Sequence, residues 1–324
     1  MSPLLTVSNL HVHFPVRGGV FLKEIGRCKA VDGVSFHLNS GETLGIIGES
    51  GCGKTTLGKA VVRLLAPTSG SVRFGGQELA TASRGRLRKM AREFQMIFQD
   101  PAESLNARHT VGGILEEPFV IQGLGGRQQR QQNVQDLLAK VGLSADAAGK
   151  FPFEFSGGQR QRIGIARAIA LQPKLVVCDE PVSALDVSVQ SQVLNLLMDL
   201  QRQMGMSYLF ISHNLAVVKH ISDRIAIMYL GKIMEMGPSE DVYRHPRHAY
   251  TKALISAIPV PDPAVKRNPL RLAGDIPSPI NPPPGCAFGH RVQAPRYGES
   301  IGKPIPFEEI SPGHFVARCP CCIE

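Results

Sequence analysis

The chain has 324 residues, enough for one large or two modest domains, and 43% of them are hydrophobic while 19% are charged. This balance is typical of a globular protein, and no apolar run approaches the roughly 18 residues that would span a bilayer, which excludes a membrane channel or carrier. The formal charge of +9 predicts either an anionic neighbour, such as nucleic acid or the inner face of a membrane, or a solvated basic surface, and charge alone does not choose among them.

The first residues, MSPLLTVSNLHVHF, lack a basic start followed by a sustained apolar stretch. We therefore expect no secretory signal and a cytoplasmic location. Residues 4–74 then contain short alternating segments separated by glycine and asparagine turns, which predicts a β-rich lobe.

A phosphate-binding loop is predicted inside this lobe. TLGIIG indicates a buried strand, GESGCGKTT fits G-x-x-x-x-G-K-[ST], and a helix is expected from Thr55 to about Leu65. Glycines let backbone N–H groups point at an anion, the helix N-terminus is positive, and Lys54 adds a full charge. We expect this loop to bind the phosphates of a nucleotide through Gly48, Glu49, Ser50, Gly51, Cys52, Gly53, Lys54, Thr55 and Thr56. Cys52 lies where a thiolate is favoured, so we expect a thiol alkylator to block nucleotide binding and bound nucleotide to protect this residue.

From residue 81 onward the pattern becomes helical, as in LRKMAREF and RQQRQQNVQDLLAKVGL, and we place a helical subdomain at about residues 81–165. The basic run RQQRQQ allows nucleic-acid contact. However, it lies on the polar side of a helix whose other side carries Val134, Leu137, Leu138 and Val141, so a solvated face is the favoured interpretation.

After Ser156 helices and strands alternate, which predicts a parallel sheet whose ligand lies beyond the carboxyl ends of its strands, and hence an α/β fold. KLVVCDE indicates a buried strand that ends in Asp179 and Glu180, and SYLFISH indicates one that ends in His213. One carboxylate is expected to reach a metal ion and the other an attacking water, while the imidazole is placed to bond a terminal phosphate. Taken alone, acidic residues at a strand exit and a single histidine are also compatible with structural roles.

The segment FSGGQRQ predicts a second anion site. Ser156 is a good N-cap for the helix RQRIGIARAIAL, and the glycines leave the first N–H groups of that helix uncovered. A simply capped helix is the alternative, but it does not explain a paired glycine followed by glutamine.

GESGCGKTT, MIFQDP, FSGGQRQ, LVVCDEP, SALD and ISH, in this order, resemble the nucleotide-binding subunit of an ABC transporter over about residues 4–237. The resemblance implies that Lys54 and the loop N–H groups hold the β- and γ-phosphates of ATP, and that Thr55 and Gln99 bind Mg²⁺ with Asp179 behind a water. It also implies that Glu180 polarises the attacking water and His213 contacts the γ-phosphate. The signature begins with Phe155 where leucine is usual.

The same resemblance implies that two such chains form a sandwich, the partner being a paralogue or a second copy. Asp186 would communicate across the dimer interface, and the signature residues Ser156, Gly157, Gly158 and Gln159 would act on the ATP of the opposite subunit. Both ATPases would lie beneath two membrane permeases, on the cytoplasmic face of the inner membrane, with a substrate-binding protein outside and the segment from Glu103 to Ile121 as the docking surface. The aromatic that stacks on adenine is not clear; Phe21 and, less so, Phe14 are candidates.

Residues 238–324 resemble the extension of dipeptide and oligopeptide import ATPases, with HPRHAYT and SPINPPPGCAFGHR as the similar segments. The expected function is ATP hydrolysis that powers peptide uptake, and nickel or another cargo is the nearest alternative. A soluble ABC ATPase acting on nucleic acid is a second class, but the long heptad insertion or second cassette of such proteins is absent from the sequence. One apolar helix face (Tyr250, Leu254, Ile255, Ile258) must pack on something, and nine prolines between Pro259 and Pro284 predict an extended strap or linker.

Seven cysteines are unevenly placed, and four of them, Cys286, Cys319, Cys321 and Cys322, fall in the last forty residues. In a cytosolic protein this pattern points away from disulfides. The resemblance implies an iron–sulfur cluster on C-terminal cysteines, but Val292 stands where the second ligand is expected. Four thiols suffice for [4Fe–4S] or for zinc, with His290 or His314 able to replace one, and reduced thiols without metal remain the alternative.

Overall fold

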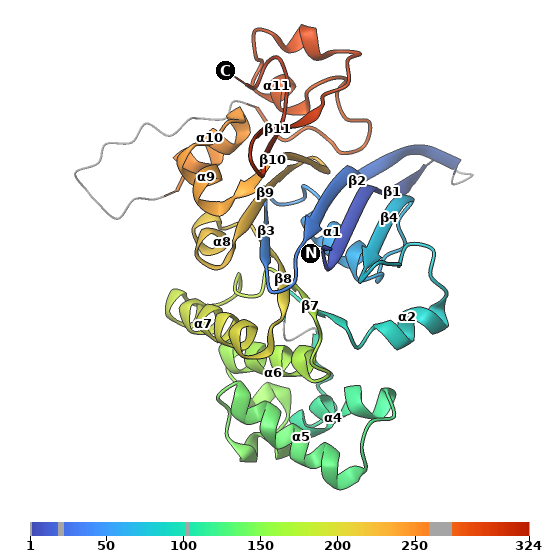
Figure 1. The fold of residues 1–324 in the computed structure, drawn as a ribbon, viewed down its shortest axis with the longest axis vertical. Coiled ribbons are helices and arrows are strands. Elements are labelled where there is room, and N and C mark those ends of the chain that lie inside the picture. Colours follow the sequence, from blue (N-terminus) through green and yellow to red (C-terminus); the bar gives the residue numbers. More distant parts are fainter. Residues whose placement is uncertain (1, 19–22, 101–103, 259–273, 324) are drawn as a thin grey trace, which may run out of the picture.

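The computed structural model describes residues 2–18, 23–100, 104–258 and 274–323. The molecule is elongated, with the C-terminal residues at one end, a group of helices at the other, and two sheets between them (Figure 1). The predicted Phe21, Glu103 and residues 259–273 of the proline-rich segment lie outside the described residues.

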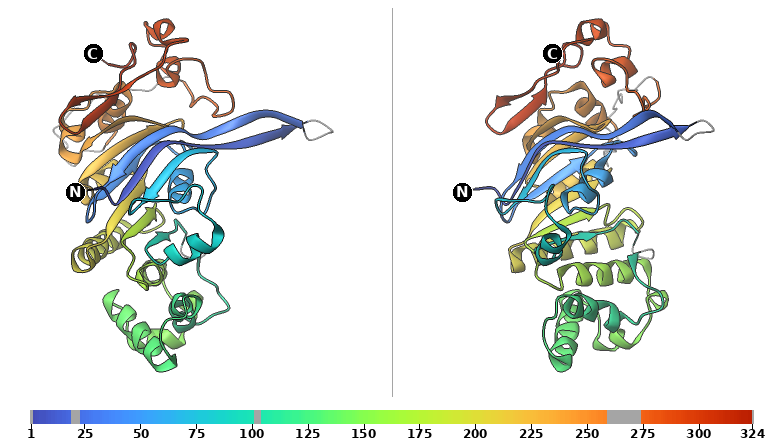
Figure 2. Two further views of the ribbon diagram at one scale, coloured as in Figure 1. Left: turned by 45° about the vertical axis from the view of Figure 1, so that its right-hand side comes forward. Right: turned by 90° about the vertical axis from the view of Figure 1, so that its right-hand side faces the viewer.

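The first sheet is antiparallel and has the strand order β2-β1-β4-β5. Its strands are β1 (Leu5–Gly18), β2 (Lys23–Leu38), β4 (Ser69–Phe74) and β5 (Gln77–Glu78). Apolar residues alternate along β1 and bury one face of the sheet, as period-2 patterning requires. The long β1–β2 hairpin projects well beyond the rest of the molecule (Figure 2).

The second sheet forms the centre of the molecule, with the order β11-β12-β10-β9-β3-β8-β7-β6. Its parallel strands are β3 (Thr43–Ile47), β6 (Phe94–Ile97), β7 (Leu175–Asp179), β8 (Ser207–Ser212) and β9 (Arg224–Tyr229). Every residue of β3, β7 and β8 is buried, because both faces of a parallel sheet are covered. The predicted α/β architecture is confirmed.

Helices cover the central sheet. α1 (Lys54–Val61) lies between the two sheets and contacts β1, β7 and β8. The remaining helices of the core are α6 (Gly157–Ile169), α7 (Val187–Met204) and α8 (Leu215–Ile221). Because β3, β7 and β8 are parallel neighbours, the loops after them meet at one edge of the sheet.

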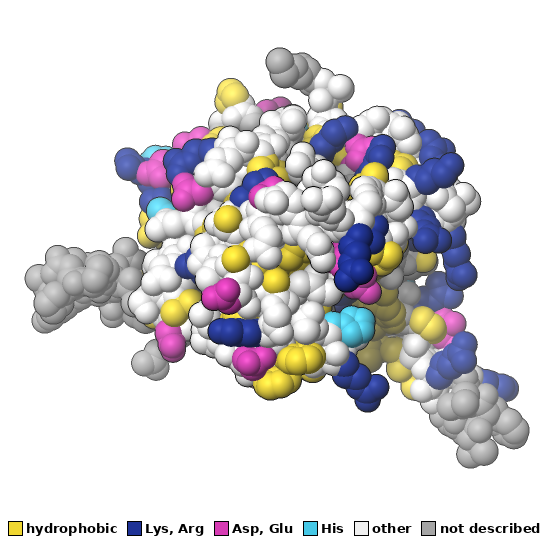
Figure 3. Space-filling view, turned by 90° about the horizontal axis from the view of Figure 1, so that it is seen from below, with side chains coloured by type: hydrophobic (Ala, Val, Ile, Leu, Met, Phe, Trp, Pro, Cys, Tyr) yellow, Lys and Arg dark blue, Asp and Glu magenta, His cyan; other side chains and the backbone are white. Residues whose placement is uncertain are grey.

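The range predicted as a helical subdomain, about residues 81–165, contains α2 (Arg84–Met90), α4 (Val111–Ile121), α5 (Arg127–Lys140) and the 3₁₀ turns η1 (Ala145–Gly149) and η2 (Pro152–Glu154), and its status as a separate unit stays a prediction. One part of the expected helical range differs, since residues 94–97 form β6, the edge strand that pairs with β7. Side chains of both charge signs are interspersed over this end of the molecule, with small hydrophobic areas between them (Figure 3). Val134, Leu137 and Leu138 are the buried residues of α5, as its pattern predicts.

The C-terminal residues continue the central sheet. β10 (Lys232–Pro238) pairs with β12 (His314–Ala317), and β12 pairs with β11 (Phe307–Ser311). α9 (Ser239–Arg244), α10 (Ala249–Ser256), α11 (Ala287–Arg291) and the turn η3 (Tyr297–Ser300) complete this part. The apolar face of α10 packs on the core as expected. The domain division after residue 237 stays a prediction, and the sheet itself is continuous across it.

Candidate nucleotide-binding and hydrolysis site

The phosphate loop connects β3 to α1, as the sequence predicts. Gly53 has φ 105°, a left-handed conformation that favours glycine, and a Cβ added there would lie 1.9 Å from the carbonyl oxygen of Ala30. A Cβ on Gly48 would lie 2.1 Å from the carbonyl oxygen of Met228. These two glycines therefore let the loop pack directly against neighbouring backbone and start α1 with its N–H groups uncovered.

Lys54 is folded onto this loop. It is only 4% exposed, and its Nζ donates to the carbonyl oxygens of Gly48 at 2.8 Å and Glu49 at 2.9 Å. A buried ammonium held at the mouth of a curled loop is suited to bind a phosphate group.

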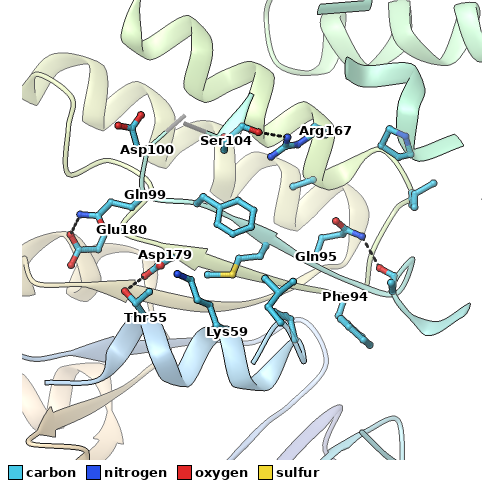
Figure 4. A pocket seen from close by; sticks show the side chains of 18 of the residues that line it. Thr55, Lys59, Phe94, Gln95, Gln99, Asp100, Ser104, Arg167, Asp179 and Glu180 are labelled. Carbon is cyan, nitrogen blue, oxygen red and sulfur yellow. Dashed lines mark hydrogen bonds between the residues drawn. The ribbon is translucent and has the colours of Figure 1, made fainter. Parts of the chain in front are cut away.

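Thr55 and Asp179 meet across the space between α1 and β7 (Figure 4). The Thr55 hydroxyl donates to Asp179 Oδ1 at 2.9 Å. Burial raises the pKa of Asp179, and the hydrogen bond from Thr55 only partly offsets this. A hydroxyl beside a buried carboxylate is a donor set that fits Mg²⁺, whose charge would favour the ionised carboxylate.

Glu180 contacts two further residues that the sequence predicts for the site, Gln99 and His213. Gln99 Nε2 donates to Glu180 Oε2 at 3.1 Å, and His213 Nδ1 lies 3.1 Å from the same oxygen. Figure 4 shows Gln99 and Glu180 joined beside the Thr55–Asp179 pair. Glu180 itself has φ 47°, an unusual value for a non-glycine residue, and the turn after β7 holds it there through its N–H bond to Ile211. The strand ends thus bring together Thr55, Gln99, Asp179, Glu180 and His213.

Two cavities adjoin these residues. One of about 620 Å³ is lined by the loop residues Ser50 to Thr56, by Gln99, Glu180 and His213, and by Phe14 and Pro279. A larger one of about 1250 Å³ extends from Thr55 and Glu180 toward the helical subdomain, where Ile121 and Arg167 line it. Phe14 is 40% exposed at the first cavity, which leaves it a candidate for stacking on a base.

The signature loop does not line either cavity. Ser156 caps α6 as predicted, in a capping box with Gln159. A Cβ on Gly158 would lie 2.5 Å from Val189 Cγ1, so glycine is needed there for close packing on α7. Asp186 is the N-cap residue of α7, is exposed, and makes no side-chain capping bond. Gly157 is exposed, like Ser156 and Gln159 beside it.

The expectation that Cys52 is a reactive thiolate is wrong. Its side chain is 4% exposed, and burial raises the pKa of the thiol more than the nearby Lys54 charge lowers it. We predict that Cys52 is alkylated much more slowly than the half-buried Cys28, as measured by peptide mass spectrometry after brief labelling of the folded protein. Equal labelling of the two cysteines would contradict this, and labelling after unfolding is the control.

Tyr250 and Arg291 also contact the phosphate loop, which the motifs did not predict. The N–H of Glu49 donates to Tyr250 Oη at 3.1 Å, Tyr250 Oη donates to Glu49 Oε2 at 3.3 Å, and Arg291 Nη1 donates to Glu49 Oε2 at 2.7 Å. Both residues come from segments typical of the extension, HPRHAYT and GCAFGHR, but nothing in those segments indicates a partner some 200 residues away.

The four C-terminal cysteines come together as one cluster. Sγ···Sγ distances are 2.8 Å for Cys319–Cys321, 3.5 Å for Cys286–Cys322 and 3.7 Å for Cys321–Cys322. Hydrogen bonds from Cys286 and Cys322 lower the pKa of Cys319, while the pKa values of the other three thiols are raised. The four ligand sulfurs all lie within 4.8 Å of one another, a spacing that could hold a metal ion.

Neither histidine proposed as a substitute ligand belongs to this cluster. His314 Nε2 lies 2.7 Å from Glu235 Oε1 inside the core, and the ring of His290 lies 5.3 Å from that of Tyr297. His11, His13 and Asp32 form a second group of potential metal ligands, whose ligand atoms also lie within 4.8 Å of one another. Lys29 and Lys232 lie within 4.0 Å of the same carboxylate, so its charge is already balanced.

A nucleotide-binding loop on β3, carboxylates after β7 and a capped signature helix define the class of ABC ATPases, and residues 31–183 match the family model described as ABC transporter. Residues 234–294 match the model described as oligopeptide/dipeptide transporter, C-terminal region. The chain is 51% identical to the oligopeptide transport ATP-binding protein AppF of Bacillus subtilis, over 97% of this chain and 96% of that protein. It is likewise 51% identical to the putative oligopeptide transport ATP-binding protein YkfD of the same organism, over 97% of this chain and 94% of that one.

Among solved structures, a dimeric post-hydrolysis state of an ATP-binding cassette bound to ADP and Pi is similar, with a TM-score of 0.65, 25% identity, and coverage of 72% of this chain and 98% of that one. The chain belongs to the family of ATP-binding subunits of oligopeptide and dipeptide ABC transporters.

Proposed function

We propose that this chain is the ATPase that energises peptide import by an ABC transporter. The observation that carries the ATPase assignment is that Lys54, Thr55, Asp179, Glu180 and His213 line two adjoining cavities, which share Thr55, Glu180 and His213. The family and the extension shared with peptide-import relatives support the transport role. None of the described helices has the length and apolar character needed to cross a bilayer. We place the chain as a peripheral subunit on the cytoplasmic face of the membrane.

Uptake of a labelled peptide by cells tests this function. Cells that lack the chain should lose uptake, the wild-type chain should restore it, and the Glu180→Gln variant should not. Unchanged peptide uptake, together with loss of nickel uptake, would favour the alternative cargo.

In the proposed mechanism Thr55 and Gln99 would hold Mg²⁺, with Asp179 acting through a water, and the ion would neutralise part of the charge of the phosphates. Lys54 and the loop N–H groups orient the β- and γ-phosphates, and Glu180 accepts a proton from the attacking water. His213 reaches Glu180 in this structure, so the same imidazole can bond the γ-phosphate while it orients the carboxylate.

A second ATPase subunit, either a paralogue or another copy, is proposed to complete each site. Its signature loop would supply the N–H groups of Gly157 and Gly158 to the opposite nucleotide, since neither cavity at the phosphate loop includes this chain's own signature residues. The similar cassette bound to ADP and Pi is dimeric, which agrees with this proposal.

We therefore predict that the purified chain hydrolyses ATP poorly when monomeric. Turnover per subunit should rise steeply with protein concentration, or on adding the paralogous ATPase, as measured by phosphate release beside light scattering. Substantial concentration-independent turnover by a proven monomer would contradict the shared site.

Two permeases are proposed to dock on the helical subdomain, and a substrate-binding protein outside the membrane would deliver peptide to them. Exposed hydrophobic side chains support this position: Val120 is 54%, Ile121 52% and Phe153 65% exposed. Single exposed apolar residues are common, but Val120 and Ile121 are consecutive in α4, and Figure 3 shows small hydrophobic areas among mixed charges at this end of the molecule. On the face that Figure 3 shows, the mixed charges do not form the continuous basic patch that would favour a nucleic-acid partner.

A metal centre is proposed for the four-cysteine cluster. Zn–S bonds of about 2.3 Å place the sulfurs of a tetrahedral site about 3.8 Å apart, which is near the 3.5 Å of Cys286–Cys322 and the 3.7 Å of Cys321–Cys322. A single zinc ion requires only Cys319 and Cys321, now 2.8 Å apart, to separate by about 1 Å, whereas the [4Fe–4S] alternative requires the sulfurs to separate further. The ion would tie the chain end, at Cys319 to Cys322, to the start of α11 at Cys286.

Anaerobically purified full-length chain is predicted to contain about one zinc ion, measured together with iron and sulfide. Binding should strengthen as pH rises, because the ion must displace protons from the three thiols whose pKa is raised. Four irons with sulfide would instead favour the cluster, and absence of all bound metal would remove both.

A further inference from the structure

The phosphate loop is supported from outside the ATPase motifs, at Glu49. Its N–H is bonded to Tyr250, and its carboxylate accepts from both Tyr250 and Arg291. Its carbonyl oxygen accepts from Lys54 Nζ at 2.9 Å. One residue therefore links the phosphate-binding lysine on one side to the C-terminal extension on the other.

Both partners of Glu49, Tyr250 and Arg291, are also held by contacts with residues outside the phosphate loop. Tyr250 is fully buried, and its ring packs 4.7 Å from Tyr229 and 5.3 Å from Phe288. The Arg291 side chain is only 9% exposed, and its Nε donates to the Gly274 carbonyl oxygen at 3.1 Å. Glu49 and the other groups around it raise the pKa of Arg291 despite the opposing effect of burial, so the guanidinium stays charged.

The short helix α11 connects this contact to the cysteine cluster. Cys286 is its N-cap residue, accepts the N–H of Gly289 at 3.2 Å, and lies 3.5 Å from Cys322. Arg291 is its last residue. At a rise of about 1.5 Å per residue, the two ends are separated by only about 8 Å, so a shift of Cys286 moves Arg291 with it.

We propose that Tyr250 and Arg291 are positioning residues for the phosphate loop, and that α11 couples the state of the cysteine cluster to the affinity for nucleotide. By holding Glu49, the pair fixes the carbonyl group that positions Lys54 and the curl of the loop around the phosphates. Since coupling between two sites is reciprocal, nucleotide binding also stabilises α11. The inference rests on the proposed nucleotide binding but not on peptide transport.

The first test measures MgATP affinity by calorimetry, well below the unfolding temperature of each variant. Arg291→Met should weaken affinity about fivefold or more, Arg291→Lys should restore part of it, and Tyr250→Phe, which keeps the packed ring, should weaken it less. The matched control is Arg244→Met, because Arg244 also follows residue 237 but pairs with Glu240 at the surface.

A double-mutant cycle separates positioning from general stability. Glu49→Gln and Arg291→Met together should weaken MgATP binding no more than the stronger single variant does, because both remove the same ion pair. If Arg291 serves stability alone, Arg291→Met lowers the unfolding temperature but leaves the affinity of the folded protein unchanged. That result, or fully additive effects, would overturn the positioning role.

Hydrogen exchange tests the coupling along α11. MgADP should slow exchange of the Gly289 and His290 amides in the wild-type chain and have no such effect in Arg291→Met. Equal exchange with and without nucleotide in the wild-type chain would overturn the coupling. None of these experiments measures peptide uptake. A failure of the coupling can therefore be distinguished from a failure of the proposed transport function.

Discussion

Replacing Glu180 with Gln is expected to abolish turnover while ATP remains bound. The amide keeps the size of the side chain and can still meet Gln99 and His213, which both contact Glu180 Oε2. It cannot accept a proton from water, and a positioned base contributes about 10²–10⁴ to the rate. We therefore expect phosphate release to fall by at least about a hundredfold, with ATP affinity by calorimetry within a few-fold of the wild-type value.

Glu93→Gln is the matched control for this experiment. Glu93 precedes β6 and pairs with Lys174 at 2.9 Å, away from the phosphate loop, so its activity should be unchanged. Wild-type turnover in Glu180→Gln would show that another group activates the water.

Lys54→Ala is expected to remove nucleotide binding itself. The change deletes the buried ammonium that donates to Gly48 and Glu49, and with it the full positive charge at the phosphate position. Charge-assisted hydrogen bonds are worth about 1.5–3 kcal/mol, so the dissociation constant for MgATP should rise at least about tenfold.

Calorimetry at constant ionic strength measures this loss, with Lys140→Ala as the control because Lys140 is an exposed residue at the end of α5. An unchanged affinity in Lys54→Ala would count against the loop as the phosphate site, whatever the turnover of the variant.

The sequence predicts those parts of the site in which short segments determine their own geometry. A strand, a glycine loop and a helix place Lys54 and Thr55 with no information from elsewhere, and Asp179 and His213 follow because parallel strands end at one edge. The burial of Cys52 was not predictable in this way. The position of Cys52 at a helix N-terminus favours a thiolate, but the packing of Gly48 and Met228 around the loop determines how little water reaches the thiol.

Contacts between distant segments were also not predictable from the pattern. Arg291 and Glu49 are 242 positions apart, and no periodicity marks either as a partner of the other. The strand β6 has only four residues, 94–97, and the residues around it show a helical pattern, so the sequence did not indicate a strand there. The cysteine cluster was predictable in part. The sequence predicts the four cysteines as ligands, but not that His290 and His314 contact Tyr297 and Glu235 instead of joining them.

The pairing of β12 with β10 changes which strand is left at the border of the central sheet. Without it, β10 would present unpaired N–H and C=O groups, with buried Met236 and Ile233 beside them, to any other extended chain. The border is instead β11, five residues long and carrying the exposed carboxylates Glu308 and Glu309. A short, charged border strand resists pairing with a second molecule. The C-terminal residues thus cover the edge of β10 and leave a border of the sheet at which a second molecule is less prone to add a strand.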